Sequence, residues 1–211
     1  KKIKRLDQII LATSKEKKDY QLIKIAKKEN IQFFRGSLNN VVNRYYMAAK
    51  KFKLDQIVRI TGDAILFDDL MMAKAISSQL KKNSDVTFIR NMPYGTAKEV
   101  INYKTIETIN NTALKLKNTE YLEWFLENSK YFNVNYIRSD YIFDNSIRLT
   151  LDFKEDLLLF NKIFKYFKDK HSRFTLKEVL RLLSVKKNLV KINSFLTPKF
   201  KKNQINAELN I

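Results

Sequence analysis

Residues 56–63 read Gln-Ile-Val-Arg-Ile-Thr-Gly-Asp, an apolar run that ends abruptly at a glycine and a carboxylate. A short run of apolar and β-branched residues bounded by a turn residue is typical of a strand buried in a sheet. We therefore expect a strand over 56–60 that breaks at the last three residues of the run. Apolar residues at helical spacing lie on both sides of it and predict helices over 41–52 and 67–80.

The same alternation of strand and helix continues in both directions from this run. Upstream, apolar runs predict strands over 9–13 and 32–34 with a helix over 19–29 between them, and downstream a strand over 86–89. Short connections between alternating strands and helices favour a parallel sheet with right-handed crossovers. The expected fold class is a Rossmann-like α/β fold, with a mixed, mostly parallel sheet and helices on both faces.

The second half of the chain is less regular. Its expected strands cover 99–101, 134–137 and 147–151, and its expected helices cover 103–116, 121–126, 154–167 and 176–183. Thr175 and Glu178 have the spacing of a capping box at the start of the last helix. In the 154–167 helix the residues expected to face the core are Leu157, Leu158, Phe160, Ile163, Phe164 and Phe167.

Length and composition bound the class of protein. The chain has 211 residues, 45% of them hydrophobic, and no cysteine. One globular α/β domain is expected over 1–202, followed by a flexible tail over 203–211. No apolar run approaches the roughly 18–20 residues of a membrane span, so no membrane association is expected. The absence of cysteine excludes disulfides and thiolate sites, and it is compatible with a cytoplasmic protein.

The charge balance leaves two interpretations open. Lys and Arg number 41 against 22 Asp and Glu, which gives a net charge of +19 and points to a nucleic-acid partner. The basic residues are mostly lysines spread along the whole chain, without an arginine-rich helix. That distribution favours compositional drift, and a basic nucleic-acid-binding domain remains the less favoured alternative.

The chain contains only three glycines, Gly36, Gly62 and Gly95, and all three lie at turns next to expected strands. In open α/β sheets, ligands bind at the carboxyl ends of strands, and there Asp63 and Asp152 end two of the expected strands. Two carboxylates brought together at such an edge suit Mg²⁺ bound with a nucleotide phosphate. The alternative is that each aspartate only caps the helix that follows it.

Four segments, taken in order, resemble a known family. They are Phe-Arg-Gly-Ser at 34–37 with Asn-Arg-Tyr-Tyr at 43–46, Val-Arg-Ile-Thr-Gly-Asp at 58–63, Tyr-Gly-Thr with Glu-Val between 94 and 100, and Arg-Leu-Thr-Leu-Asp at 148–152. The sequence is similar to the cytidylyltransferase family, which includes spore-coat polysaccharide biosynthesis, acylneuraminate and 3-deoxy-manno-octulosonate enzymes. The similarity extends over roughly residues 8–193, and it implies the nucleotide-diphospho-sugar transferase fold.

The resemblance also implies an activity and a set of site residues. The reaction would be Mg²⁺-dependent transfer of CMP from CTP to a sugar acid, for the biosynthesis of cell-surface polysaccharide. Asp63 and Asp152 would hold the metal. The residues implied beside the nucleotide are Arg35, Gly36, Ser37, Thr61, Gly62 and Arg44, although Arg44 is equally compatible with a helix carboxylate as its partner. The residues implied beside the sugar are Tyr94, Gly95, Thr96 and Glu99.

Several positions depart from the family pattern. The chain lacks the family's opening strand and its Gln-Ala-Arg…Arg-Leu-Pro-Gly-Lys loop, and we therefore expect it to be truncated at the N-terminus. A vacant strand position predicts a chain that is marginally stable, aggregates or forms a homodimer through the exposed edge of the 9–13 strand, and that binds CTP weakly. Ala64-Ile65 and Phe153-Lys154 also replace family residues. An inactive relative that only binds nucleotide or sugar is thus an alternative.

Overall fold

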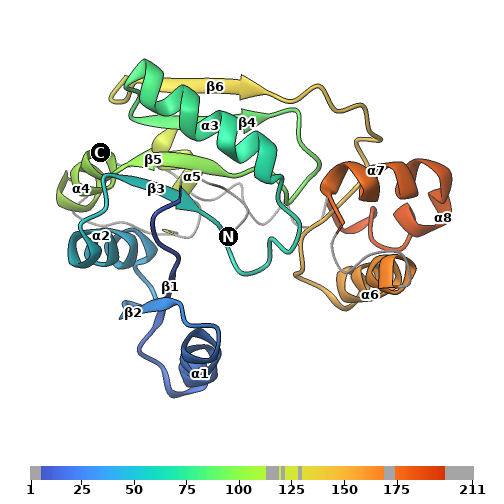
Figure 1. The fold of residues 1–211 in the computed structure, drawn as a ribbon, viewed down its shortest axis with the longest axis horizontal. Helices are drawn as coiled ribbons and strands as arrows, with labels where there is room; N and C mark the ends of the chain where they lie inside the picture. The colour runs from blue at the N-terminus through green and yellow to red at the C-terminus, as the bar shows by residue number, and fades with distance from the viewer. Residues whose placement is uncertain (1–5, 113–118, 120–121, 128–129, 169–173, 198–211) are drawn as a thin grey trace.

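The computed structural model describes residues 6–112, 119, 122–127, 130–168 and 174–197 (Figure 1). Its strands are β1 (Ile10–Ser14), β2 (Gln32–Gly36), β3 (Gln56–Arg59), β4 (Val86–Arg90), β5 (Glu99–Asn102) and β6 (Val134–Arg138). Its helices are the 3₁₀ helix η1 (Lys17–Asp19), α1 (Tyr20–Lys28), α2 (Val41–Phe52), α3 (Asp69–Lys82), α4 (Tyr103–Thr112), α5 (Leu122–Leu126), α6 (Lys154–Lys168), α7 (Leu176–Val185) and α8 (Lys187–Val190). Within the described ranges, no helix has the length and apolar character needed to cross a membrane.

The strands form two sheets where the sequence predicts one mostly parallel sheet. The parallel pair β1 and β2 stands apart from a four-stranded sheet of order β3-β5-β4-β6 (Figure 1). In the larger sheet β4 and β6 are parallel, whereas β5 is antiparallel to both of its neighbours. The connection between β4 and β5 is short, and a parallel crossover needs a dozen or more residues, so β5 has to return antiparallel.

Helices cover both faces of the four-stranded sheet, as the sequence predicts. Successive strand residues point to opposite faces, so Ile57 and Val58 on β3 enter different cores. One face packs on α2, α4 and α5, and the other packs on α3. The first core includes Ile57, Phe88 and Ile101 from the strands, and the second includes Ile89 and Val100 with Val58 and Ile137.

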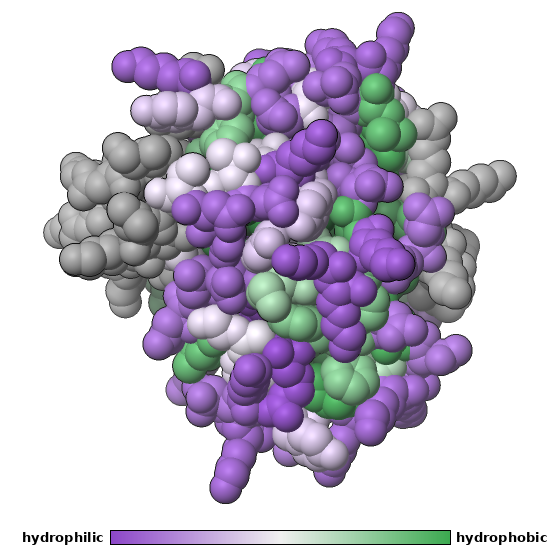
Figure 2. Space-filling model, turned by 90° about the vertical axis from the view of Figure 1, so that its left-hand side faces the viewer, coloured by the Kyte–Doolittle hydropathy of each residue, from purple (hydrophilic) through white to green (hydrophobic). Residues whose placement is uncertain are grey.

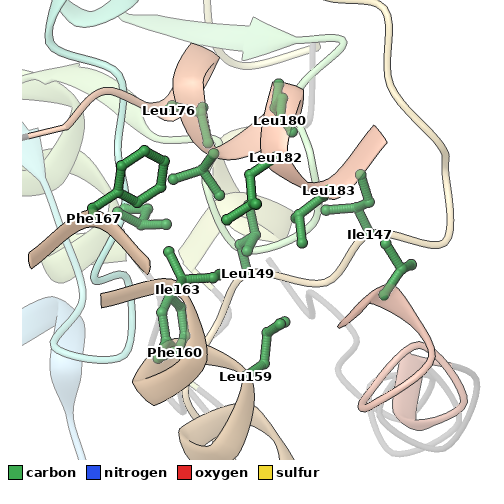
Figure 3. Packing of buried hydrophobic residues seen from close by; sticks show 13 residues of the cluster. Ile147, Leu149, Leu159, Phe160, Ile163, Phe167, Leu176, Leu180, Leu182 and Leu183 are labelled. Atoms are coloured by element: carbon green, nitrogen blue, oxygen red, sulfur yellow. The ribbon is translucent and has the colours of Figure 1, made fainter. Parts of the chain in front are cut away.

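A third core lies beyond the sheets, among α6, α7 and α8 (Figures 1 and 3). Ile147 and Leu149 extend into it from the segment before α6, where they meet Phe160, Ile163 and Leu183. The predicted strand over 147–151 is wrong, because among the described residues this segment makes a single bridge, between Arg148 and Tyr94. Residues 147–150 are all buried, and their alternation of apolar and polar side chains reflects an extended chain packed between a helical core and a polar site.

The helix predictions hold in type, with shifts at their ends. The capping box at the start of α7 is confirmed, because the Thr175 side chain accepts from the Glu178 backbone and the Glu178 side chain accepts from the Thr175 backbone. Part of the predicted 103–116 helix and the whole predicted 203–211 tail lie outside the described residues. Hydrophilic side chains dominate the face shown in Figure 2, with hydrophobic ones in patches between them.

Candidate functional site

Three chain segments meet at the carboxyl end of β3. The segment after β3 carries Asp63, whose backbone carbonyl accepts a hydrogen bond from the Leu151 N–H at 3.1 Å. The turn between β4 and β5 carries Tyr94, whose carbonyl accepts from the Leu149 N–H at 2.8 Å. Backbone hydrogen bonds therefore fix residues 148–152 against the other two segments.

Gly95 permits the close approach of the β4–β5 turn to residues 149 and 150. It has a φ of +90°, and a Cβ added to it would lie 2.6 Å from the Thr150 Cβ and 2.7 Å from the Leu149 carbonyl oxygen. Any side chain here would be both strained and obstructed. Thr96 then closes the turn, since its hydroxyl donates to the Pro93 carbonyl at 2.8 Å.

The structure brings Asp63 and Asp152 together on one hydroxyl group. The Thr150 Oγ1 lies 2.7 Å from Asp63 Oδ2 and 3.2 Å from Asp152 Oδ2. A threonine hydroxyl carries one hydrogen, so it donates fully to only one of these carboxylates at a time. The two carboxylates thus concentrate negative charge around one hydroxyl group, and a nearby cation would favour their ionised forms.

Arg148 and Asp156 hold Asp152 in place through hydrogen bonds to its carboxylate and its backbone. Both are fully buried, and Arg148 donates through Nε to Asp156 Oδ1 at 3.0 Å and through Nη2 to Asp152 Oδ2 at 2.5 Å. Asn193 adds a hydrogen bond to Asp156 Oδ1 at 2.8 Å. Burial acts to raise the pKa of Asp156, but the bonds from Arg148, from backbone N–H groups and from Asn193 outweigh it and lower that pKa.

The aspartates do not cap the helices that follow them. At α3 the cap is Asp68, whose carboxylate accepts from the Met71 N–H at 2.9 Å. At α6 the N–H groups of Asp152 and Phe153 are both accepted by the Asp156 carboxylate. The capping alternative is therefore wrong for Asp63 and Asp152, whose carboxylates point to the Thr150 hydroxyl instead.

The electrostatic surroundings keep Asp63 ionised. Burial acts to raise its pKa, but hydrogen bonds from Thr61, from Thr150 and from its own backbone, together with the charge of Lys98, lower the pKa overall. On the other side of the site, burial raises the pKa of Tyr94 to about 12 despite the neighbouring Arg148 charge, so its phenol stays protonated.

Glu99 is the first residue of β5 and is buried, as Thr96 in the preceding turn is. Its carboxylate accepts from Arg59 Nη1 at 2.6 Å, and both side chains are buried. Burial acts to lower the pKa of Arg59, but the Glu99 carboxylate and Tyr45 raise it above its ordinary value. The polar groups of Thr96 and Glu99 thus have partners within the protein, and both residues shape the turn.

Of the six residues expected beside the nucleotide, Thr61 and Gly62 immediately precede Asp63, whereas the other four form a second group around the end of β2. A Cβ on Gly36 would lie 2.9 Å from the Arg44 Cγ, and Arg44 Nη1 donates to the Ser37 carbonyl at 2.7 Å. Arg35 Nη2 donates to the Lys15 carbonyl at 2.5 Å. Within the described residues, no hydrogen bond or ion pair joins any of these four residues to Asp63. Asp63 follows β3, which belongs to the four-stranded sheet.

The two carboxylates fit a magnesium ion whose remaining ligands are water molecules and substrate phosphates. Among the described residues no group of three or more His, Cys, Asp or Glu side chains converges. Asp63 and Asp152, which share the Thr150 hydroxyl, are the two carboxylates that could hold the ion. Mg²⁺ is commonly bound through one or two carboxylates, with water and substrate phosphates in the remaining positions. Arg148 already neutralises part of the charge on Asp152, which leaves Asp63 as the less compensated carboxylate.

Comparison with known proteins decides the family. A family model described as cytidylyltransferase matches residues 1–192 of this chain. The chain belongs to the cytidylyltransferase family. The members of this family are nucleotidyltransferases, so the family and the class of enzyme implied by the four segments are confirmed. The match begins at residue 1, and it does not support the expected loss of the family's opening strand and loop.

Two relatives of this cytidylyltransferase are similar in sequence. An uncharacterized protein of Methanocaldococcus jannaschii is 33% identical over 169 residues, which cover 79% of this chain and 70% of that protein. The spore coat polysaccharide biosynthesis protein SpsF of Bacillus subtilis is 30% identical over 153 residues, which cover 71% of this chain and 64% of that protein. The chain thus spans about two thirds of the length of these relatives.

A solved structure shares the fold of this cytidylyltransferase. A cytidylyltransferase from Leptospira borgpetersenii matches with a TM-score of 0.78 at 24% identity, covering 86% of this chain and 77% of that chain. The similarity confirms an α/β fold of the type found in cytidylyltransferases. The mixed sheets and the helices on both faces of the larger one agree with it.

Sequence reasoning missed three residues that build the site. Arg148 and Thr150 alternate with apolar residues ahead of Asp152, and an extended chain points every second side chain the same way. That period of two, in Arg-Leu-Thr-Leu-Asp, was a signal that could have grouped Arg148 and Thr150 with Asp152. Asp156 lies four residues after Asp152, which is the separation of neighbours on one helix face.

Proposed function

We propose that this cytidylyltransferase transfers CMP from CTP to a hydroxyl group of a sugar acid, with Mg²⁺ held by Asp63 and Asp152. The convergence of these two carboxylates on the Thr150 hydroxyl carries the proposal. Asp63 and Thr150 are 87 residues apart in sequence, and backbone hydrogen bonds fix their two segments together. Membership of the cytidylyltransferase family supports CTP as the nucleotide.

The chain's own residues supply position and charge. Arg148 and Asp156 fix the Asp152 carboxylate through buried bonds, and Thr150 sets the spacing between Asp152 and Asp63. When bound, Mg²⁺ would neutralise negative charge on the nucleotide phosphates and on the leaving pyrophosphate. Preformed ligands of this kind cost little reorganisation when the charge develops.

The reaction exchanges one phosphorus–oxygen bond for another. The hydroxyl oxygen of the sugar acid bonds to the α-phosphorus of CTP, and the bond from that phosphorus to the oxygen bridging to the β-phosphorus breaks. Pyrophosphate leaves with the electron pair of the broken bond, and the hydroxyl proton passes to solvent. The products are the CMP-sugar, pyrophosphate and one proton.

The remaining site residues divide between the two substrates. We place Arg35, Gly36, Ser37 and Arg44 beside the nucleotide, together with Thr61 and Gly62. The turn from Tyr94 to Glu99 is placed beside the sugar, because it is fixed against residues 148–150 next to Asp152. A role in polysaccharide biosynthesis is supported by the printed name of the Bacillus subtilis relative.

Pyrophosphate release tests this function directly. The chain is incubated with CTP and Mg²⁺, and with N-acetylneuraminate or 3-deoxy-manno-octulosonate as acceptor. We expect pyrophosphate in amounts equal to the CMP-sugar, with no release when GTP replaces CTP. Asp140 is an exposed aspartate outside the site, and Asp140→Ala is the matched control for Asp63→Ala and Asp152→Ala. CTP binding without turnover for every acid tested would instead support an inactive, binding-only relative.

A further inference from the structure

Lys98 is a buried lysine near the site where the segments carrying Asp63, Tyr94 and residues 148–152 meet, which we call the three-segment site. It precedes β5, and because Glu99 pairs with Arg59 at the end of β3, Lys98 lies beside the chain that leads from β3 to Asp63. Only 8% of the residue is exposed. Among the residues that the structure describes, its ammonium group makes no hydrogen bond and no ion pair within 4 Å.

Three of the four charged groups around Lys98 have hydrogen-bond partners of their own. Its electrostatic neighbours are Glu99, Asp63, Arg59 and Glu123. Glu99 is paired with Arg59, and Asp63 accepts from Thr150. Burial is the largest influence and lowers the pKa of Lys98, while Glu99 and Asp63 act to raise it.

The chain is open to solvent at Gly62, the residue before Asp63. A Cβ added to Gly62 would meet no atom within 4 Å, so the chain on this side faces open space. A buried ammonium without a direct partner is unfavourable, because it has lost water and gained no hydrogen bond in return. A negatively charged oxygen of a ligand bound beside Asp63, with which Lys98 interacts electrostatically, would supply the missing partner and offset this cost.

We propose that Lys98 binds a negatively charged oxygen of a substrate at the three-segment site. This inference rests on the proposed function, since it assigns the residue to the same site. The oxygen belongs either to the carboxylate of the acid acceptor or to a phosphate of CTP. Both are the same chemistry to an ammonium group, and binding measurements on each substrate separate them.

The test compares Lys98→Met with the wild-type chain by calorimetry. Methionine keeps much of the length and apolar volume of lysine and removes only the charged end. The probes are CTP with Mg²⁺, N-acetylneuraminate, 3-deoxy-manno-octulosonate and inorganic pyrophosphate. We expect Lys98→Met to raise the Kd of at least one probe tenfold or more. A loss confined to an acid assigns the carboxylate, and a loss confined to CTP and pyrophosphate assigns a phosphate.

Two further variants separate a binding role from a structural one. Lys98→Arg keeps the charge and should restore much of the lost affinity, which a merely structural position would not do. Lys81 is an exposed lysine on α3, and Lys81→Met should bind every probe as the wild type does. If Lys98→Met does not fold, Lys98→Arg and Lys98→Gln still distinguish a charge-dependent Kd from an unchanged one.

The outcomes also separate this inference from the proposed function. Lys98-dependent binding of pyrophosphate or an acid by a chain without CMP transfer would sustain the role of Lys98 and overturn the function. CMP transfer with equal Kd values in Lys98→Met and wild type would sustain the function and overturn the role of Lys98. A wild-type chain that binds none of the four probes would overturn it as well.

Discussion

At the scale of single residues, the Thr150 hydroxyl sets the charge balance of the site. It lies within hydrogen-bonding distance of Asp63 and Asp152 and has one hydrogen to give. Asp152 also receives a bond from Arg148, whereas Asp63 has Lys98 only as a more distant charge. Removal of the charge of Asp63 should therefore weaken cation binding without disturbing the buried ion pair between Arg148 and Asp156.

We expect Asp63→Asn to lower kcat less than Asp63→Ala does. The amide keeps one oxygen for the metal but loses the negative charge, while alanine removes both. The loss for alanine should be about a hundredfold or more, the range seen when one preformed electrostatic group is deleted. Steady-state pyrophosphate release measures both values, with Asp140→Asn as the control. Wild-type kcat in Asp63→Asn would contradict a metal-binding role for this residue.

Asp156 supports the site from the interior, and we expect Asp156→Asn to destabilise the fold. The change removes the negative charge that pairs with the buried Arg148 guanidinium, and breaking a buried ion pair in this way costs about 3–5 kcal/mol. Because the pKa of Asp156 is lowered in the folded state, its stabilisation is complete above its ordinary value of 3.8 and is lost as the pH falls through the lowered value.

Urea unfolding at several pH values checks this prediction. The difference in unfolding free energy between wild type and Asp156→Asn should be full at pH 7 and shrink progressively below about pH 4. Asp140→Asn, at an exposed position, should follow the wild type throughout. A difference that stayed constant down to pH 2 would mean that the charge of Asp156 is not what stabilises the fold.

At the scale of elements, local patterns gave the type of each segment more reliably than its partners. The extended course of residues 147–151 follows from their alternation of apolar and polar residues, but the one bridge they make within the described part of the chain is to Tyr94, in a turn distant in sequence. Hydrogen bonds to Tyr94 and Asp63 satisfy the N–H groups that a sheet neighbour would otherwise take. Nothing in the alternation itself distinguishes these two kinds of partner.

For helix α6 the sequence predicts the helix itself but not all of the residues that it buries. The sequence predicts Leu157, Leu158 and Phe164 in the core, yet all three are between 44% and 50% exposed. The residues actually buried include Leu159, which sequence reasoning did not assign to the core. A helix that is apolar around most of its circumference does not indicate which side meets α7, so tertiary contacts decide it.

The β4–β5 turn provides a prediction for one element. We expect Gly95→Ala to lower the free energy of unfolding by about 1–3 kcal/mol, because the alanine would be strained at positive φ and would collide with Thr150. Gly62→Ala is the matched control, since its Cβ meets open space and its stability should change by less than about 1 kcal/mol. Chemical denaturation measures both variants, and equal stability would show that the turn is not held as described.

At the scale of the whole molecule, the division into two sheets is the feature that the sequence did not predict. Within the described residues, β1 pairs only with β2, and β3 pairs only with β5. Each strand therefore keeps one side without a sheet partner, and unpaired edges promote association between chains. The sequence predicts an exposed edge at the 9–13 strand because a neighbouring strand is expected to be missing. In the structure this edge is exposed because β1 and β2 form a sheet of their own.

We expect the 211-residue chain to self-associate through the free edge of β1. Ile9, next to β1, is 41% exposed, and a charge at this position should oppose edge-to-edge pairing. Light scattering over a range of concentrations should give a mass above that of the monomer for wild type and a lower mass for Ile9→Lys. Leu22→Lys, on α1 with 39% exposure, is the matched control and should behave as wild type. A monomer at every concentration would contradict an accessible edge.

The metal site at Asp63 and Asp152 is the central claim about the molecule, and a calorimetric Mg²⁺ titration in the presence of CTP tests it most directly. The wild type and the Asp140→Ala control should bind Mg²⁺ with the same affinity. Asp152→Ala should lose at least about tenfold in affinity, the loss expected even for a group that only supports a metal ligand, while keeping its cooperative thermal unfolding. Unchanged Mg²⁺ affinity in a folded Asp152→Ala chain would contradict the account.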